Sequence, residues 1–564
     1  MGDLLSGRYS NSGKRPTKET APTTGDGSTT IPTSPTGPGS AHLGVNLEGL
    51  TDYSRLQPFV DMMKSARVWG SAAAPWDETV PTDATGWPTT DAGVVVAVVT
   101  RDTSDEGNSY KYLAPGTYAL RFTGKATVGA VSSPDVSIAN YAYDQAANRS
   151  TADVVVGAAA TQLILGFRDT IGGVRDVSLR RPGYSDTQTF TNEFIQAAAP
   201  FGVFRFMDFL GTNNNPVRTW AERTTPASGT QTGRKGAAYE YAIQMANELG
   251  KDIWINIPAG ADDDFIRQLA TLLKAKLAPE RVVYVEYSNE LWNFVFSQTK
   301  QNMEWAVAEA IAGDTTLTNG KQCTQALFDA ASGECNQYWA GFFRAGKRVA
   351  ETSKIFSGVF GAEAMNTRVR VVYATQFANP AIAEGVLKNI ATYRGTPSSL
   401  LYGVATAPYF YLPSETASSE TASMDQILTG LENSLLTETE PYFAARKAYT
   451  TADATGATHK SLADYYGIKS LGYEGGPDLG QSSANGTAKI AANRDARMGG
   501  MVKSELTQWF GCGNDLFMYF TLSSQWDRWG YWGLTNDPKN LSGAKYSAAR
   551  DVAQTARSNL TTCR

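Results

Sequence analysis

The chain has 564 residues, a net charge of -5 at neutral pH, 42% hydrophobic residues and a mean hydropathy of -0.29. This length predicts one large domain with an accessory part, and no apolar run approaches the roughly 18 residues that a membrane-spanning helix needs. The pI of about 5.4 and the lack of an evident basic patch argue against a nucleic-acid partner.

Histidine and carboxylate content limits the chemistry that the chain offers. Only two histidines occur, His42 and His459, and neither lies near a Gly-x-Ser-x-Gly motif, so a Ser-His-Asp triad is not indicated. No spacing of histidine, cysteine and carboxylate residues indicates a zinc site, and we expect no metal and no other cofactor. Carboxylates therefore remain as the candidate acids and bases.

Four cysteines, an even number, are compatible with two disulfides and an oxidising location. Their spacing allows Cys323–Cys335 within one loop and Cys512–Cys563 at the C-terminus, although three pairings are possible and four free thiols are an alternative. The first residues show no apolar signal-peptide core. A processed leader, another export route or incorporation into a virion would each agree with an extracellular, cell-surface or periplasmic location.

The N-terminal part of the chain changes character near residue 40. Residues 1–40 are rich in Ser, Thr, Pro and Gly without periodicity, which predicts a disordered, flexible tether. The ordered part is expected to form a barrel from residues 41–89 and 183–564. Its first strand is predicted at 43–48, followed by a helix that Asp52 or Ser54 caps and that ends near Lys64.

Residues 90–182 differ from the flanking sequence because short β-type runs alternate with turn clusters. Regularly spaced short strands predict a small β-sandwich inserted into the larger domain. Such an insert would bind carbohydrate or shape a cleft, with a purely stabilising role as the alternative. The predicted strands are 94–99, 116–122, 153–156, 162–167 and 176–179.

From residue 202 onward strands and helices alternate, which is typical of a parallel α/β fold. Together with the first strand, the chain then has eight predicted strands, so we expect a (β/α)8 barrel with long loops. Helices are predicted at 237–249 and 262–276, and Asp262-Asp263-Asp264 is interpreted as a helix start rather than a metal site. The seven further strands are 202–208, 252–257, 281–285, 369–374, 401–405, 468–474 and 516–520.

Two of these strands end in a glutamate. Tyr284–Asn289 passes from an apolar strand into polar residues and leads to Glu290, while Ile468–Tyr473 leads to Glu474 and two glycines that allow a sharp turn. Barrel enzymes keep their active sites at the carboxyl ends of the strands. Glu290 would end strand four and Glu474 strand seven, across the barrel from each other, so the two carboxylates can flank a glycosidic bond.

Asn289-Glu290 and Glu474 at these strand ends resemble the signature of clan A retaining glycoside hydrolases, a superfamily of cellulase-like (β/α)8 barrels. The resemblance covers roughly residues 42–545 and is closest to bacterial proteins described loosely as cellulose-binding or hypothetical. It implies Glu290 as the acid and base, Asn289 as a ligand of the sugar 2-hydroxyl and Glu474 as the nucleophile. Tyr287-Ser288 departs from the pattern of clan members, which often carry tryptophan or another residue there, and this affects packing more than mechanism.

Further residues match this superfamily by role. Arg205 resembles the arginine that orients the nucleophile, although a buried ion pair with Asp208 is an alternative for it. Tyr409 resembles the residue that is hydrogen-bonded to the nucleophile. The expected substrate-binding set also includes Asp208, Trp292 and Tyr473.

The segment after the eighth strand, Gln525–Trp532, resembles the tryptophan floor of the central sugar subsite in this superfamily. Trp526 or Trp529 is expected to stack on the sugar, and a place in the core is the alternative.

The expected function is a retaining glycoside hydrolase that cleaves β-linked polysaccharide by double displacement with Glu474 and Glu290. Long loops favour endo-action, although loops can also close a cleft into a pocket. The alternatives are a non-catalytic carbohydrate-binding protein and a virion-associated glycan depolymerase or adhesin. The sequence does not predict the linkage, the particular polysaccharide or the oligomeric state.

Overall fold

A computed structural model describes residues 42–98, 113–445, 448–450 and 456–564. The predicted N-terminal tether, residues 1–40, and the last residue of the predicted strand 94–99 lie outside these ranges.

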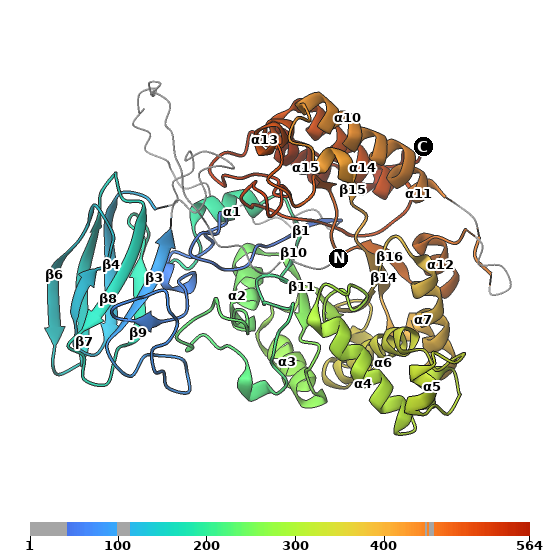
Figure 1. Cartoon of the computed structure of the whole chain (residues 1–564), viewed down its shortest axis with the longest axis horizontal. Coiled ribbons are helices and arrows are strands. Elements are labelled where there is room, and N and C mark those ends of the chain that lie inside the picture. The colour runs from blue at the N-terminus through green and yellow to red at the C-terminus, as the bar shows by residue number, and fades with distance from the viewer. Residues whose placement is uncertain (1–41, 99–112, 446–447, 451–455) are drawn as a thin grey trace. The chain divides into compact units, whose positions relative to one another are not determined.

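Eight parallel strands close into a barrel in the order β1-β10-β11-β12-β13-β14-β16-β18, which confirms the predicted (β/α)8 fold (Figure 1). Each barrel strand pairs in parallel with its neighbours, from Asn46 opposite Arg205 between the first two strands to Leu43 opposite Phe517 where the barrel closes. The strands are β1 Leu43–Asn46, β10 Val203–Arg205, β11 Asp252–Ile257, β12 Val283–Tyr287, β13 Val369–Ala374, β14 Gly403–Thr406, β16 Lys469–Gly472 and β18 Phe517–Tyr519.

Helices surround the barrel and pack on it through a continuous apolar core (Figure 1). The predicted helices 237–249 and 262–276 correspond to α2 and α3, and the Asp262 carboxylate caps α3 by accepting a hydrogen bond from the Phe265 amide at 2.7 Å. The α-helices are α1 Asn192–Ala198, α2 Tyr239–Leu249, α3 Asp263–Lys276, α4 Ser297–Ile311, α5 Gln325–Asp329, α6 Gln337–Phe360, α7 Pro380–Tyr393, α8 Pro397–Leu400, α9 Ser414–Ala417, α10 Met424–Ser434, α11 Glu440–Ala444, α12 His459–Tyr466, α13 Gly486–Arg494, α14 Ala496–Gly511 and α15 Ala544–Gln554.

The helix predicted from Asp52 or Ser54 to Lys64 is wrong, because only a short 3-10 turn forms there, at Met62–Lys64. Pro58 explains the difference, since a proline disfavours the helical conformation in the residue before it. Gln57, which precedes Pro58, has a positive φ of 41°. The apolar side chains whose spacing predicted a helix are nevertheless buried, as Phe59 shows.

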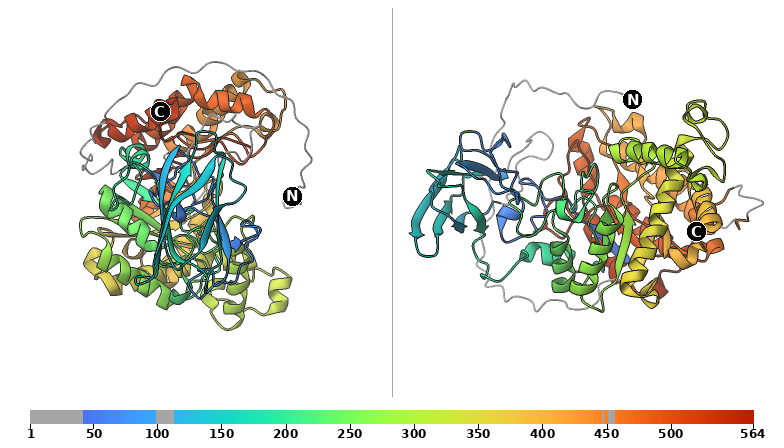
Figure 2. Two further views of the ribbon diagram at one scale, coloured as in Figure 1. Left: turned by 90° about the vertical axis from the view of Figure 1, so that its left-hand side faces the viewer. Right: turned by 90° about the horizontal axis from the view of Figure 1, so that it is seen from below.

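The part of the chain that connects β1 to β10 forms two four-stranded antiparallel sheets, with the strand orders β2-β3-β8-β5 and β6-β7-β4-β9 (Figures 1 and 2). Side chains from both sheets form one apolar cluster, so the sheets pack face to face as a sandwich. The predicted strands are β3, β4, β7, β8 and β9, whereas β2, β5 and the largely exposed edge strand β6 were not predicted. The strands are β2 Gly70–Ser71, β3 Ala92–Val98, β4 Gly116–Thr123, β5 Thr127–Ala130, β6 Val136–Asp144, β7 Arg149–Val156, β8 Gln162–Arg168 and β9 Arg175–Arg180.

Both disulfides join the cysteines that lie nearest in the sequence. Cys323–Cys335 closes the segment that contains α5, and Cys512–Cys563 ties the C-terminal residues to the end of α14. These bonds indicate an oxidising environment.

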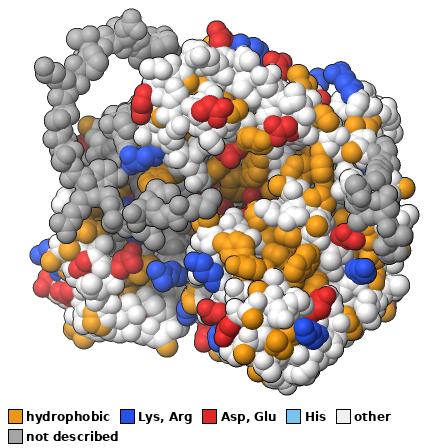
Figure 3. Space-filling view, turned by 45° about the vertical axis from the view of Figure 1, so that its right-hand side comes forward, with side chains coloured by type: hydrophobic (Ala, Val, Ile, Leu, Met, Phe, Trp, Pro, Cys, Tyr) orange, Lys and Arg blue, Asp and Glu red, His pale blue; other side chains and the backbone are white. Residues whose placement is uncertain are grey.

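Within the described ranges, no helix is both long and apolar enough to cross a lipid bilayer. Hydrophobic side chains gather around a hollow on one face of the molecule (Figure 3).

Candidate active site

Glu290 and Glu474 follow the carboxyl ends of β12 and β16, where the backbone takes unusual conformations. Ser288 and Glu290 have positive φ values of 62° and 45°, which are uncommon for residues other than glycine and are often found at functional sites. After Glu474, Gly476 has a φ of 120°, and a Cβ at Gly475 would lie 2.3 Å from the Phe517 ring. The turn therefore needs both glycines.

Tyr473 connects the two strand ends. Its phenol donates a hydrogen bond to Oε1 of Glu290 at 2.9 Å, although the two residues belong to different strands. The other carboxylate oxygen, Oε2 of Glu290, accepts a hydrogen bond from the Asn293 side chain at 2.8 Å. The predicted residues Glu290, Tyr473 and Glu474 are thus brought together at the same end of the barrel.

Glu474 is held by two donors and is only 7% exposed. Nη1 of Arg205 donates to its Oε1 at 2.8 Å, and the Tyr409 hydroxyl donates to its Oε2 at 3.0 Å. Each carboxylate oxygen therefore has a hydrogen bond that the ionised form accepts best, one of them from a cation. This leaves Glu474 fixed in orientation.

Arg205 lies at the centre of the polar network and is fully buried. Its guanidinium donates to Glu286 at 2.9 and 3.1 Å, and to the side-chain oxygens of Asn46 and Asn289, both at 2.9 Å. Its ion-pair partners are Glu286 and Glu474, so the alternative pairing of Arg205 with Asp208 is wrong. One buried cation thus faces two carboxylates.

The electrostatics of the two candidate glutamates follow from burial. Removal from water raises the pKa of Glu290. It also raises the pKa of Glu474, where the Arg205 cation opposes the shift and repulsion from Glu290 adds to it. The pair therefore tends to keep a proton near neutral pH. Only Glu474 contacts the guanidinium directly, and this contact favours its ionised form.

A cavity of about 390 Å³ opens beyond the ends of β1, β10 and β18. Burial raises the pKa of Asp208 to about 6 and that of Glu48 to about 7. The cavity is lined by Glu48, Tyr53, Asp208, Phe520, Thr521, Ser524, Gln525, Asp527, Trp529, Gly530 and Trp532. Its wall therefore combines carboxylates with indole rings.

The two candidate tryptophans have different surroundings. Trp529 is 57% exposed and lines the cavity, whereas Trp526 is 4% exposed, donates a hydrogen bond to the Gly533 carbonyl at 3.0 Å and belongs to an apolar cluster. Trp292 is partly buried and packs against the main core. Trp529 is thus the indole of this set that is placed to meet a ligand.

Several site residues were missed by the sequence analysis. Glu286 points into the barrel below Glu474, where it also accepts a hydrogen bond from the Trp254 indole at 2.7 Å. Asn46 ends β1, and Trp532 lines the cavity beside Phe520. The period of two in β12, in which Tyr284 and Glu286 share the barrel interior, was the signal available for Glu286.

The two histidines are buried apart from this network. The His459 ring lies 2.6 Å from the Tyr442 hydroxyl, and His42 packs on the Phe510 ring. Within the part of the chain that the structure describes, no group of three or more histidine, cysteine or acidic side chains could hold a metal ion.

No protein-family model and no curated protein matches the sequence. Among solved structures, the chain is similar to the GH51 arabinofuranosidase from Xanthomonas axonopodis pv. citri, with a TM-score of 0.42 and 12% identity over 65% of this chain and 67% of that chain. It is also similar to PfGH50B, with a TM-score of 0.25 and 8% identity over 84% of this chain and 95% of that chain. Because both TM-scores are low, neither similarity supports an argument about function.

Proposed function

We propose that the chain is a retaining glycoside hydrolase that cleaves β-linked polysaccharide, with Glu474 as the nucleophile and Glu290 as the acid and base. The observation that carries the proposal is the unequal environment of the two glutamates. Glu474 receives hydrogen bonds from a buried cation and a phenol, whereas Glu290 receives them from a phenol and an amide. Such a difference separates an ionised carboxylate from a protonated one.

In the first step, a carboxylate oxygen of Glu474 would form a bond to the anomeric carbon. The bond from that carbon to the leaving oxygen breaks, and Glu290 transfers its proton to this oxygen. As negative charge leaves Glu474, its hydrogen bonds to Arg205 and Tyr409 weaken, and Arg205 stays neutralised by Glu286. Glu290 ends the step as a carboxylate.

In the second step, the Glu290 carboxylate would take a proton from a water molecule whose oxygen attacks the anomeric carbon. The bond to Glu474 breaks, so both glutamates return to their starting states and the sugar keeps its configuration. The Tyr473 phenol can donate to Glu290 in its ionised state as well, which suits a group that changes its role between the steps.

Substrate binding is assigned to the cavity and to Asn289. The Asn289 side chain is held between Arg205 and the Asn213 amide oxygen, at 2.9 and 3.1 Å, and lies beside Glu290 in the sequence. Trp529 offers an exposed ring for the apolar face of a sugar, and the Asp208 carboxylate in the same wall can accept hydrogen bonds from sugar hydroxyls.

The stereochemistry and the two roles can be tested together. Proton NMR during hydrolysis should show the β-anomer of the new reducing end first, whereas initial formation of the α-anomer would contradict the double displacement. The Glu290→Gln variant should lose activity on polysaccharide but keep the first step on a 2,4-dinitrophenyl β-glycoside, because this leaving group needs no proton. Equal loss on both substrates would remove Glu290 from the acid role.

A further inference from the structure

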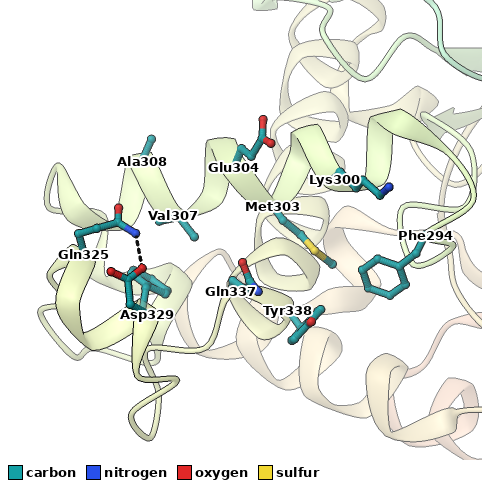
Figure 4. A pocket seen from close by; sticks show the side chains of 11 residues that line it. Phe294, Lys300, Met303, Glu304, Val307, Ala308, Gln325, Asp329, Gln337 and Tyr338 are labelled. Carbon is teal, nitrogen blue, oxygen red and sulfur yellow. Dashed lines mark hydrogen bonds between the residues drawn. The ribbon is translucent and has the colours of Figure 1, made fainter.

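A second groove lies outside the candidate active site, between α4 and the segment formed by α5 and the start of α6 (Figure 4). Its volume is about 650 Å³, larger than that of the cavity beside Asp208. Phe294 and Tyr338 lie at one end of the groove, and Gln325 and Asp329 lie at the other (Figure 4).

Phe294, the first groove residue in the sequence, follows four residues after Glu290, and backbone hydrogen bonds join this segment to Glu290. The Asn293 amide donates to the Glu290 carbonyl at 2.8 Å, and the Thr299 hydroxyl in the first turn of α4 lies 3.1 Å from the same carbonyl and 2.7 Å from that of Asn293. Phe294 belongs to this hydrogen-bonded segment. Its ring is therefore placed by the same backbone that places the proposed acid.

The start of α6 projects beyond the end of the barrel that carries the two glutamates. Arg348, within α6, forms an ion pair with Asp263 at the start of α3 and lies over the Tyr287 ring at the end of β12. Both partners mark the carboxyl end of the barrel strands. The preceding residues of α6 thus extend past this end, and the first two of them, Gln337 and Tyr338, line the groove.

Two aromatic rings, those of Phe294 and Tyr338, are exposed together at one end of the groove. Phe294 is 44% exposed and Tyr338 is 47% exposed, and their ring centroids lie 5.6 Å apart in a T-shaped arrangement. Exposed aromatic rings that are fixed against each other mark a binding surface, since they offer apolar area at little cost in conformational entropy. The faces of pyranose rings present C–H groups that such rings can contact.

The far wall of the groove is restrained by a disulfide bond and a side-chain hydrogen bond. It is formed by α5, which lies in the segment that the Cys323–Cys335 disulfide closes. The Gln325 side chain donates to Asp329 at 2.9 Å within this wall (Figure 4). The charged side chains of the groove are Lys300, Glu304 and Asp329, so both signs are present and neither dominates. This composition suits a neutral, hydroxyl-rich polymer.

We propose that this groove, with Phe294 and Tyr338 at its entrance, binds the leaving-group part of a polysaccharide chain. The proposal rests on the proposed function, because the group that protonates the leaving oxygen must face the leaving side of the cleaved bond. Glu290 and the groove are joined through the segment 290–299, which places the groove on that side. Binding several sugars beyond the cleaved bond would favour a polymer over a short glycoside as the substrate.

The test compares a polymer with a substrate that is too short to reach the groove. Affinity electrophoresis in gels that contain barley β-glucan, galactomannan or arabinoxylan measures polymer binding. Two proteins are compared: the full chain with Glu474→Gln alone, and the same chain that also carries Phe294→Ala and Tyr338→Ala. We expect the two aromatic changes together to weaken binding of the recognised polymer about tenfold. Tyr465→Ala, a change of a 49% exposed tyrosine on α12, should leave it unchanged.

The hydrolysis of 4-nitrophenyl β-glycosides separates this proposal from the proposed function. In the otherwise unchanged protein, Phe294→Ala with Tyr338→Ala should change kcat/KM on these short substrates by less than about twofold. Polymer binding that is unaffected by the two changes, or absent in the parent protein, would overturn the groove proposal. Failure of the parent protein to hydrolyse any aryl glycoside or polymer would count against the proposed function instead.

Discussion

The Tyr473 phenol reaches across from the end of β16 and donates a hydrogen bond to Glu290 at 2.9 Å. The residue next to one candidate glutamate thereby positions the other. Because Tyr473 is fully buried, its hydrogen bond is not exchanged for one with bulk water, and the relative position of the two carboxylates depends on it.

Tyr473→Phe should therefore lower kcat by about tenfold to a hundredfold, because a hydrogen bond to a carboxylate contributes about 1.5–3 kcal/mol. Steady-state kinetics on the polysaccharide that the parent protein hydrolyses checks this. Tyr546→Phe is the matched control, since Tyr546 is equally buried but donates to the Ala197 carbonyl away from the site. Equal effects of the two changes on kcat would show that Tyr473 acts only through stability.

Tyr409→Phe should change the pH dependence of activity. The Tyr409 hydroxyl donates to Glu474, and the loss of a donor to the ionised form raises the pKa of a carboxyl group further. A nucleophile that must be ionised is then less available at low pH, so the acidic limb of the kcat/KM profile should move to higher pH. A loss of the same size at every pH would contradict this role.

The two tryptophans of the 525–532 segment should respond differently to replacement. Trp529→Ala should raise KM for polysaccharide and leave the melting temperature nearly unchanged, because Trp529 is exposed in the cavity wall. Trp526→Ala should lower the free energy of unfolding by about 3–5 kcal/mol, because it leaves a cavity in the core. Kinetics and thermal denaturation of both variants separate binding from packing.

Glu505 should make the protein less stable as the pH rises. Its side chain is fully buried, and burial raises its pKa well above 4.5 although the Gly476 backbone donates a hydrogen bond that lowers it. Above the unfolded pKa the unfolded chain releases this proton while the folded protein keeps it. The free energy of unfolding then falls by up to about 1.4 kcal/mol per pH unit until the folded pKa is reached.

Glu505→Gln removes this titration, so the variant should gain stability relative to the parent protein between pH 5 and 8 and show little difference near pH 4. Urea denaturation across this range measures it. Glu280→Gln, at a largely exposed carboxylate, should leave the pH dependence as it is. A parallel pH dependence in the parent and the Glu505→Gln variant would contradict the account of Glu505.

The barrel could be predicted from the sequence because its strands are apolar runs that alternate with helices. The strand that precedes Glu290 illustrates this, since Val283 and Val285 face the core and Ser288 follows directly where the strand ends. The 52–64 segment has buried residues with helix-like spacing but forms no long helix, because Pro58 disfavours the helical conformation in the residue before it.

The positions of Glu290, Glu474, Arg205 and Tyr409 at one end of the barrel were accessible to strand counting. The partners of Arg205 were not, because Asn46 and Glu286 meet it only through the register between β1, β10 and β12. A local pattern also does not show which of two nearby tryptophans faces a cavity. That choice depends on how the chain after β18 folds back, as the contact of Trp526 with Gly533 shows.

The most direct test of the central claim is the rate of reducing-end release from β-glucans, mannans, xylans and bacterial exopolysaccharides by the parent protein and by Glu474→Gln. Glu280→Gln serves as the control for a carboxylate outside the site. We expect the parent protein and the control to hydrolyse the same polymer and Glu474→Gln to be slower by about a thousandfold or more. Hydrolysis by Glu474→Gln at the rate of the parent protein would contradict this expectation.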